Sequence, residues 1–438
     1  MRILNKSFVN SKDAEQVFSM TGDIINSKIA KTFHIAKVGL SFYIRIMRLG
    51  LPVFMLFAIY GIVNTFLPIL LRLKSYSATN IGLLLSIFEI SGIVFPFLLS
   101  TKLENSKSKY RFLLFCAFIM SITIFPLIIF ENFYLSLVCL SLFAIGFKGA
   151  VPASDTMINL SLAKNPSQYG TIRVFGSVGF VFMTLIMQLF LNAQTVSKNQ
   201  LCIWFFVPIF LFFLSLFVFP KELKTGSIHQ TQIAKIESEK AGEKIENGKK
   251  KIFNFSPFFI AVIFLLFSTF FALTPATKLF SLYVTEFLHL NCASALWAIS
   301  ATTEIPFMFF SGKFLKRFGC VKLIIFCAII ASVRLLIYIL IPNLAGAIIG
   351  QSLNAITYGL LHPAAVLFAF KYAPPNAKTL ANAMYSIFAI GLASILGNAI
   401  GGFVIDKFGY KTLFLSFGFI PIFALIVFAF FYKKIKTN

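Results

Sequence analysis

The chain has 438 residues, of which 58% are hydrophobic and only 12% are charged, and its mean hydropathy is +0.87. So few charges cannot cover the surface of a soluble protein of this size, and the composition therefore predicts a polytopic membrane protein. A formal net charge of +24 would suggest nucleic-acid binding in a soluble protein, but the distribution of the charges argues against it.

The basic residues are concentrated in the two termini and in alternate loops, which is the positive-inside asymmetry of membrane proteins. The opposite side carries Arg72, Lys74, Lys198, Lys407 and Lys411. This asymmetry predicts a multi-pass protein of the plasma membrane (the bacterial inner membrane) with both termini in the cytoplasm, and no nucleic-acid partner.

Residues 1–49 form a predicted cytoplasmic tail, because they lack the apolar core and small-residue cleavage site of a signal peptide. From Ile29 to Met47, apolar residues recur at three- and four-residue spacing with basic residues between them. That pattern predicts a basic amphipathic helix on the inner leaflet. The alternative is that translation starts at Met47, since the first apolar segment follows almost at once.

Twelve apolar segments follow, each near the roughly 20 residues that a helix needs to cross about 30 Å of hydrocarbon. Six predict an N-terminal bundle over 50–220, and six predict a C-terminal bundle over 255–433. Residues 221–254 are rich in Lys and Glu and predict a solvated cytoplasmic linker, and 434–438 a cytoplasmic tail. The predicted fold class is an all-α polytopic membrane protein with twelve transmembrane helices.

The two halves repeat each other at an offset of 211 residues. Phe115-Cys-Ala117 overlays Phe326-Cys-Ala328, and Pro152-Ala153 overlays Pro363-Ala364. Agreement between this repeat and the linker position predicts two related six-helix bundles with a cavity between them at mid-membrane, which is an architecture of transporters.

Ionisable residues inside apolar segments are candidates for function, because a charge in the membrane is costly unless it faces a polar interior or a partner. Asp155 and Arg173 are eighteen residues apart, just inside the facing ends of two consecutive segments. Gly176 and Gly179 follow on a small-residue face that permits close helix packing. The alternative is an ion pair that only fixes the two helix ends.

The run Gly170-Thr-Ile-Arg-Val-Phe-Gly-Ser-Val-Gly-Phe180 resembles the fifth-helix signature of the lactose-permease-like branch of the major facilitator superfamily. That branch includes oligosaccharide, nucleoside and phenylpropionate proton symporters. The resemblance implies the major facilitator fold and a substrate contact for Asp155 and Arg173, which match a sugar-binding carboxylate and arginine. Phe180 stands where the family has a sugar-stacking tryptophan, so a flat apolar face remains there without the indole N–H.

Glu89, Lys148 and Lys278 are further candidates for substrate contact in the cavity. Glu89 lies one turn from the repeat equivalent of Glu304, although a role in helix packing is an alternative. Lys278 follows Pro275, where a proline-loosened turn would present it to the cavity, whereas snorkelling to the outer surface is the alternative. The segments hold more cations than carboxylates, which favours a small anionic solute over a cation.

Glu304 is the candidate for proton coupling, because a carboxyl group buried between apolar neighbours can load and release a proton near neutral pH. Arg334 and His362 on the next two segments are its expected partners, and a static Glu–Arg brace is the alternative. The resemblance supports the same three residues, which match positions in phenylpropionate-type members. Ala365 stands where lactose permease has its coupling carboxylate.

These features predict a secondary active transporter that moves a small organic solute (a sugar, a nucleoside, or an aromatic or other organic acid) by alternating access and proton symport. We expect a monomer in the bilayer, driven by the proton gradient, with no cofactor, metal or catalytic group. The alternatives are a uniporter, a transporter-shaped sensor or scaffold without flux, and a membrane enzyme. An enzyme is disfavoured because the four histidines (34, 229, 289 and 362) are isolated and no Asp-x-Asp motif occurs.

Overall fold

A computed structural model describes residues 44–100, 106–162, 168–220, 223–224, 255–374 and 377–437. The predicted amphipathic helix and the predicted linker lie almost entirely outside these residues. The described residues from Gly50 onward form one compact unit, which contains the candidate site. Every regular element in the described part of the chain is a helix.

The first half of the unit contains six long helices that begin and end near polar turns. The side chain of Asn132 accepts a hydrogen bond from the Leu135 backbone N–H at 3.1 Å and so caps one of them, and Ser197 and Gln200 form a capping box on another. The helices are Ile44–Leu73, α2 (Ala78–Ser100), α3 (Ser106–Ile129), α4 (Phe133–Ser161), α5 (Tyr169–Phe190) and α6 (Lys198–Leu216).

The second half is built from interrupted helices. A π-helical segment starts at Pro275, whose ring nitrogen cannot donate the usual helical hydrogen bond. The elements are α9 (Pro257–Thr274), η2 (Pro275–Leu279), α10 (Phe280–Leu282), η3 (Tyr283–Phe287), α11 (Ala293–Phe318), α12 (Cys320–Leu340), α13 (Leu344–Ser352), α14 (Asn354–Thr357), α15 (Leu361–Tyr372), α16 (Lys378–Ala383), η5 (Met384–Leu392) and α17 (Ala393–Thr437).

The described residues contain ten helices that are long and apolar enough to cross a membrane. One of them, Leu380–Phe430, is two helices joined at Gly409, where φ is 78°. The 26-residue helix α11 is also long enough to span, but Glu304 and the basic residues of its last turn make it less apolar. Counting Leu380–Phe430 as two helices and adding α11 gives the twelve predicted spans within the described residues. The all-α polytopic fold is confirmed.

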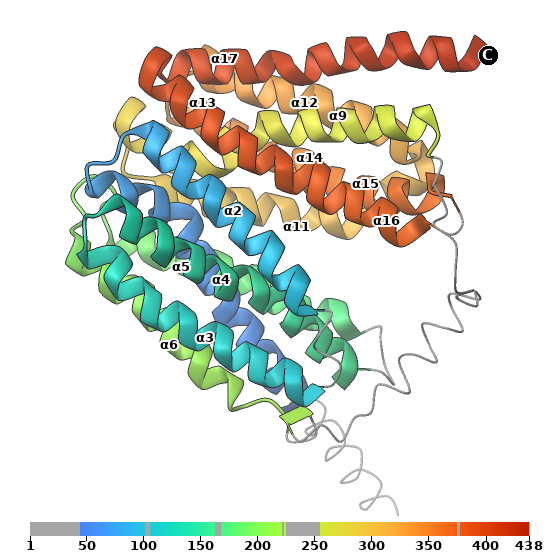
Figure 1. Cartoon of the computed structure of the whole chain (residues 1–438). Coiled ribbons are helices and arrows are strands. Elements are labelled where there is room, and N and C mark those ends of the chain that lie inside the picture. Colours follow the sequence, from blue (N-terminus) through green and yellow to red (C-terminus); the bar gives the residue numbers. More distant parts are fainter. Residues whose placement is uncertain are drawn as a thin grey trace, which may run out of the picture. The chain divides into compact units, whose positions relative to one another are not determined.

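The helices of each half pack mainly against one another, as Figure 1 shows. In the first half α3 packs against α4 and α6, and in the second half α17 packs against α9 and α12. The halves meet where α2 packs against α17 and where α5 packs against α11. These two pairings are equivalent under the internal repeat, because they join the second span to the eleventh and the fifth to the eighth. The predicted domain boundaries stay predictions.

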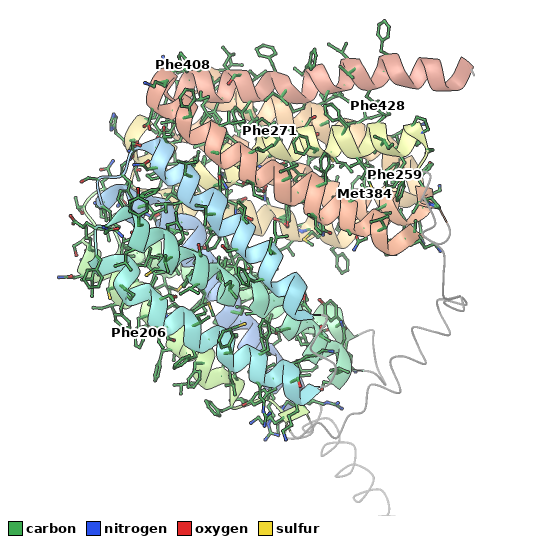
Figure 2. All side chains as sticks on the ribbon, in the orientation of Figure 1. Phe206, Phe259, Phe271, Met384, Phe408 and Phe428 are labelled. Atoms are coloured by element: carbon green, nitrogen blue, oxygen red, sulfur yellow. The ribbon has the colours of Figure 1, made fainter. Side chains whose placement is uncertain are left out.

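Large apolar side chains project from the helices, as the sticks of Figure 2 show. Phe408 and Phe423 are 63% and 68% exposed, whereas Phe259 and Phe428 lie in the apolar core of the second half. Exposure of so many aromatic and aliphatic side chains would be unfavourable in water, and it suits helices that face lipid.

Glycines allow α2 and α17 to approach with their backbones in contact. A Cβ atom added to Gly402 would lie 2.2 Å from the carbonyl oxygen of Ala78, and one added to Gly82 would lie 2.3 Å from that of Asn398. Any larger residue would therefore force the two helices apart at this crossing.

We expect Gly402→Ala to lower the stability of the protein by about 1–3 kcal/mol, because the added methyl group overpacks a backbone contact. Gly312→Ala is the matched control, since a Cβ there meets nothing within 4 Å. The melting temperatures of the purified variants in detergent provide the measurement. A Gly402→Ala protein as stable as the control would show that the helix pair can shift at no cost.

Candidate functional site

A cavity of ≈ 470 Å³ is lined by residues from both halves of the chain. Its wall combines aromatic side chains with six charged ones, which is unusual in a membrane interior and marks it as the candidate site. The charged lining residues are Glu89, Lys148, Arg173, Lys278, Glu304 and Arg334.

Glu89 of α2 forms ion pairs with two lysines that come from different halves. Lys148 Nζ of α4 lies 2.7 Å from Glu89 Oε2, and Lys278 Nζ of η2 lies 2.8 Å from Glu89 Oε1. The absence of a side chain at Gly92 makes room for Lys148, because a Cβ there would lie 2.4 Å from Lys148 Cγ. We call Glu89, Lys148 and Lys278 the lysine–glutamate cluster.

The geometry of the cluster bears on two questions that the sequence leaves open: where Lys278 lies, and whether Glu89 faces the cavity or packs between helices. Lys278 lines the cavity rather than extending to the outer surface, because the π-helical segment Pro275–Leu279 carries it. Glu89 both lines the cavity and joins the two halves through its ion pairs. Its cavity contact and its packing role are therefore not exclusive.

Glu304 of α11 is linked to Arg334 through an intervening amide. Asn354 Nδ2 donates to Glu304 Oε2 at 3.1 Å, and Arg334 NH1 donates to Asn354 Oδ1 at 2.8 Å. Arg334 is 1% exposed and also donates to Thr357 Oγ1 at 2.9 Å and to Gln351 Oε1 at 3.2 Å. The guanidinium is thus held by neutral acceptors rather than by a carboxylate.

Arg334 and His362, the expected partners of Glu304, do not contact its carboxylate directly in this arrangement. Asn354 stands between Glu304 and Arg334, and His362 Nδ1 lies 2.6 Å from the hydroxyl of Tyr385 instead. His362 is not among the lining residues of the cavity in the described part of the chain. Sequence spacing does not predict the burial of Arg334 among amide groups, since Gln351 and Asn354 lie on the separate segments α13 and α14.

Arg173 of α5 lies between a carboxylate and an aromatic ring. Its NH1 is 3.9 Å from Asp155 Oδ1, and its guanidinium carbon is 4.3 Å from the centroid of the Phe57 ring. Arg173 and Phe180 line the cavity, whereas Asp155 is not among the described lining residues. Asp155 therefore contacts Arg173 without belonging to the described cavity lining, and it can orient the guanidinium group.

Aromatic residues of the first helix and α4 form one wall of the cavity. The ring centroids of Tyr60 and Phe147 are 4.0 Å apart, and those of Phe57 and Tyr60 are 5.2 Å apart, all nearly parallel. Phe57, Tyr60 and Asn64 follow one another at three- and four-residue spacing and line the cavity together. That spacing was the available signal for Phe57, whereas nothing in the sequence distinguished Phe147 from other phenylalanines.

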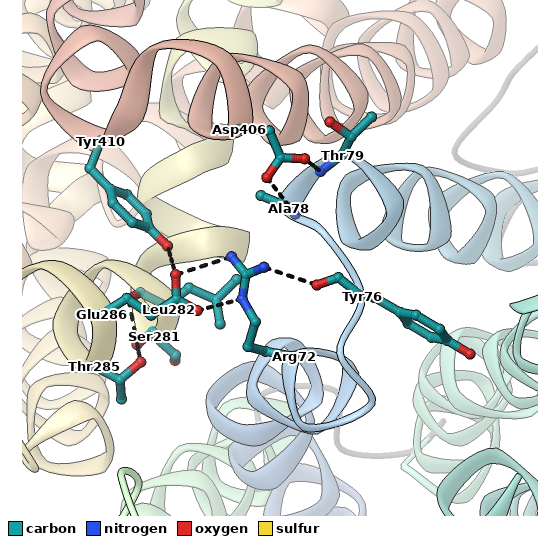
Figure 3. A network of polar contacts seen from close by, with 10 residues as sticks. All are labelled: Arg72, Tyr76, Ala78, Thr79, Ser281, Leu282, Thr285, Glu286, Asp406 and Tyr410. Atoms are coloured by element: carbon teal, nitrogen blue, oxygen red, sulfur yellow. Dashed lines mark hydrogen bonds and ion pairs between the residues drawn. The ribbon is translucent and has the colours of Figure 1, made fainter. Parts of the chain in front are cut away.

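A network of ion pairs and hydrogen bonds joins the two halves at one end of the helices (Figure 3). Arg72 makes two parallel contacts with Glu286, from Nε to Oε1 at 2.5 Å and from NH2 to Oε2 at 3.0 Å. The hydroxyl of Tyr410 donates to the same carboxylate at 2.7 Å. Asp406 accepts hydrogen bonds from the backbone N–H groups of Ala78 and Thr79, and so caps α2 with a side chain from the other half.

The turns between α5 and α6 and before α11 add contacts at the same end. Gln188 Nε2 donates to the carbonyl oxygen of Asn291 at 2.7 Å, and the Asn291 side chain accepts from the backbone of Ala193 at 2.6 Å. We call this set of contacts the end clamp. By the charge distribution it lies on the predicted outer side.

Within the described residues, no group of three or more His, Cys, Asp or Glu side chains is arranged to hold a metal ion. The lining itself contributes two carboxylates, four cations and an aromatic wall.

Comparison with known proteins places the chain among transporters. The MFS_1 like family model matches residues 46–416. The "Uncharacterized transporter YwbF" of Bacillus subtilis (strain 168) is 25% identical over 377 residues, which cover 84% of this chain and 89% of that protein. A maltose permease of Geobacillus stearothermophilus is 24% identical over 290 residues, 66% of this chain and 69% of that protein. The solved structure of the nucleoside transporter NupG superposes with a TM-score of 0.69 at 17% identity, over 89% of this chain and 99% of that one.

We expect Arg72→Gln to favour opening at the end clamp, because the bidentate contact with Glu286 is lost. A charged hydrogen bond contributes about 1.5–3 kcal/mol, and 1.4 kcal/mol corresponds to a tenfold shift in population. The measurement uses a variant that lacks the six native cysteines and carries Ala301→Cys as a reporter in the cavity. In intact cells, an impermeant maleimide should label this cysteine about tenfold faster when Arg72→Gln is present than when Arg72 is kept.

The control for this measurement is Lys198→Gln, which breaks an ion pair with the largely exposed Glu131 at the same end of the first half. Its labelling rate should match that of the parent. Equal rates in Arg72→Gln and the parent would contradict a gating role for the end clamp.

We expect Arg334→Lys to lower stability by about 1–3 kcal/mol, since a single ammonium nitrogen cannot reach all the acceptors that NH1 and NH2 now bind. Arg317→Lys, at the exposed end of α11, keeps the same change of chemistry without these partners. Melting curves of the two proteins check the prediction. A stable Arg334→Lys variant would mean that the charge alone matters there.

Proposed function

Because this chain belongs to the MFS_1 like family and is a multi-pass transporter of the major facilitator superfamily, we propose that it is a secondary active transporter coupled to protons. It moves a small organic solute across the plasma membrane by alternating access. Relatives named as a maltose permease and a nucleoside transporter support a solute of this size.

The observation that carries the proton coupling is the position of Glu304. Its carboxylate lines the cavity, and the hydrogen bond it accepts there comes from the neutral amide of Asn354. A carboxyl group in such a place is suited to take up and release a proton as its surroundings change. Arg334, which binds the same Asn354 amide, is the group whose movement changes the surroundings of Glu304.

Asn354 acts as the switch between the two groups in this proposal. While its amide bridges them, Arg334 is satisfied by neutral acceptors and Glu304 can hold a proton. A rearrangement of the interrupted segments α13 and α14 would bring the guanidinium against the carboxylate and favour release of the proton. The breaks between these short helices provide a place for such a movement.

The solute binds to other lining residues in the same proposal. Arg173 and Phe180 offer a cation and a flat apolar face, and Lys148 and Lys278 offer two ammonium groups. Asp155 contributes by holding Arg173 in place. Opening of the end clamp gives access from the outer side, and its closure leaves the cavity to the inner side.

We expect Glu304→Gln to abolish proton-driven accumulation while leaving exchange intact. One proton per solute across a one-unit pH gradient provides 1.36 kcal/mol, enough for about tenfold accumulation. A glutamine keeps the side-chain size but cannot carry the proton, so the accumulation ratio should fall to about one. The solute is first identified by thermal-shift screening of sugars, nucleosides and aromatic carboxylates at pH 6 and pH 8, and uptake is then measured in proteoliposomes.

Glu131→Gln is the matched control, because the Glu131 side chain is 67% exposed in a turn outside the cavity. It should accumulate solute like the parent. Undiminished accumulation by Glu304→Gln would overturn coupling through this residue, and absence of flux in the parent itself would favour a sensor with a transporter fold.

A further inference from the structure

The lysine–glutamate cluster shows a carboxylate already bound in the cavity. Both oxygens of Glu89 are within 2.8 Å of an ammonium nitrogen, one from Lys148 and one from Lys278. The two lysines thus form a clamp whose spacing matches the two oxygens of one carboxylate. A ligand that carries the same group would find the same geometry.

The lysines are turned toward the cavity more than the glutamate is. Their side chains are 23% and 24% exposed, whereas that of Glu89 is 6% exposed. Each ammonium has three N–H donors, and Glu89 is the ion partner of both. Donor capacity is therefore left on the side that a solute would approach.

The charges of the lining do not balance. Four cations, Lys148, Lys278, Arg173 and Arg334, exceed three carboxylates, which are Glu89 and Glu304 of the lining and Asp155, the ion partner of Arg173. An excess of positive charge in an environment of low dielectric constant is unfavourable, and a bound anion relieves it. A neutral solute would leave the excess uncompensated.

An apolar surface adjoins the clamp and fits the remainder of an organic ligand. Phe147 precedes Lys148 in α4, and its ring stacks on that of Tyr60 in the cavity wall. The ammonium of Lys148 and the flat wall thus come from consecutive residues, which places a cation beside an apolar face.

We propose that the transported solute carries a carboxylate, which binds between Lys148 and Lys278 and displaces Glu89 from the clamp. Glu89 is then a built-in competitor that occupies the site when the solute is absent. This inference rests on the proposed function, since it takes the cavity to be the solute site. Lys148 belongs to the first half and Lys278 to the second, so the solute itself joins the halves when bound.

The competing explanation is that the cluster is a static brace between the halves. The two explanations differ in what happens when Glu89 loses its charge. A brace without its carboxylate is only weakened. A clamp freed from its competitor binds external carboxylates more tightly.

The experiment measures binding of matched carboxylate and neutral ligands to the purified full-length protein by isothermal titration. The pairs are 3-phenylpropionate with its primary amide, gluconate with glucose, and orotate with uracil. We expect the parent to bind at least one carboxylate in preference to its neutral partner. Glu89→Gln should bind that carboxylate about tenfold more tightly, and Lys278→Met about tenfold more weakly.

Lys198→Met is the control, because Lys198 pairs with Glu131 away from the cavity, and its affinity should equal that of the parent. If Glu89→Gln is unstable, the carboxylate should restore its melting temperature, and the neutral partner should not. Equal binding of the two partners, no binding of any carboxylate, or weaker carboxylate binding by Glu89→Gln would each overturn the proposal.

Binding requires no gradient, so these results are independent of proton coupling. The parent should prefer the carboxylate in titrations whether or not it accumulates the solute. Loss of coupling with intact carboxylate preference would leave the clamp in place and revise only the energy source.

Discussion

Two ammonium groups holding one carboxylate across the middle of the protein are the interaction on which the candidate site depends. Charges in a membrane interior are unfavourable unless each is paired with an opposite charge, and here the pairing requires residues from both halves. The cavity therefore exists with its present charge only when α2, α4 and η2 are brought together. Any motion that separates the halves must provide these groups with new partners. An anionic solute could pair with the lysines, and a proton could neutralise the carboxylate.

The second polar system of the cavity follows a different principle. Arg334 is satisfied by Asn354, Thr357 and Gln351, all neutral, and Glu304 meets it only through an amide. Because only the Asn354 amide separates Glu304 from Arg334, a small rearrangement would bring the two charged groups into contact. The lysine–glutamate cluster, in direct contact, joins the halves, whereas the Glu304 system lies wholly within the second half.

The end clamp links these sites to the direction of access. Its ion pair, its helix cap and its amide contacts all join the two halves at the end where Gly82 and Gly402 bring the backbones together. Close backbone packing gives that end its rigidity, while the polar contacts can be exchanged for water when it opens. Apolar packing alone would give little directional preference, since lipid is as apolar as the helix surfaces.

The sequence by itself determined the twelve spans and the set of buried charges, because helix length and the cost of a charge in lipid are local properties. It also identified the motif of α5 around Arg173 and the internal repeat. Only the tertiary structure decided which polar groups meet: Glu89 with two lysines, Glu304 with Asn354 rather than His362, and Arg72 with Glu286. The physical reason is that these pairs span from 50 to more than 200 residues of chain, so their distances depend on how the helices pack and not on any local pattern.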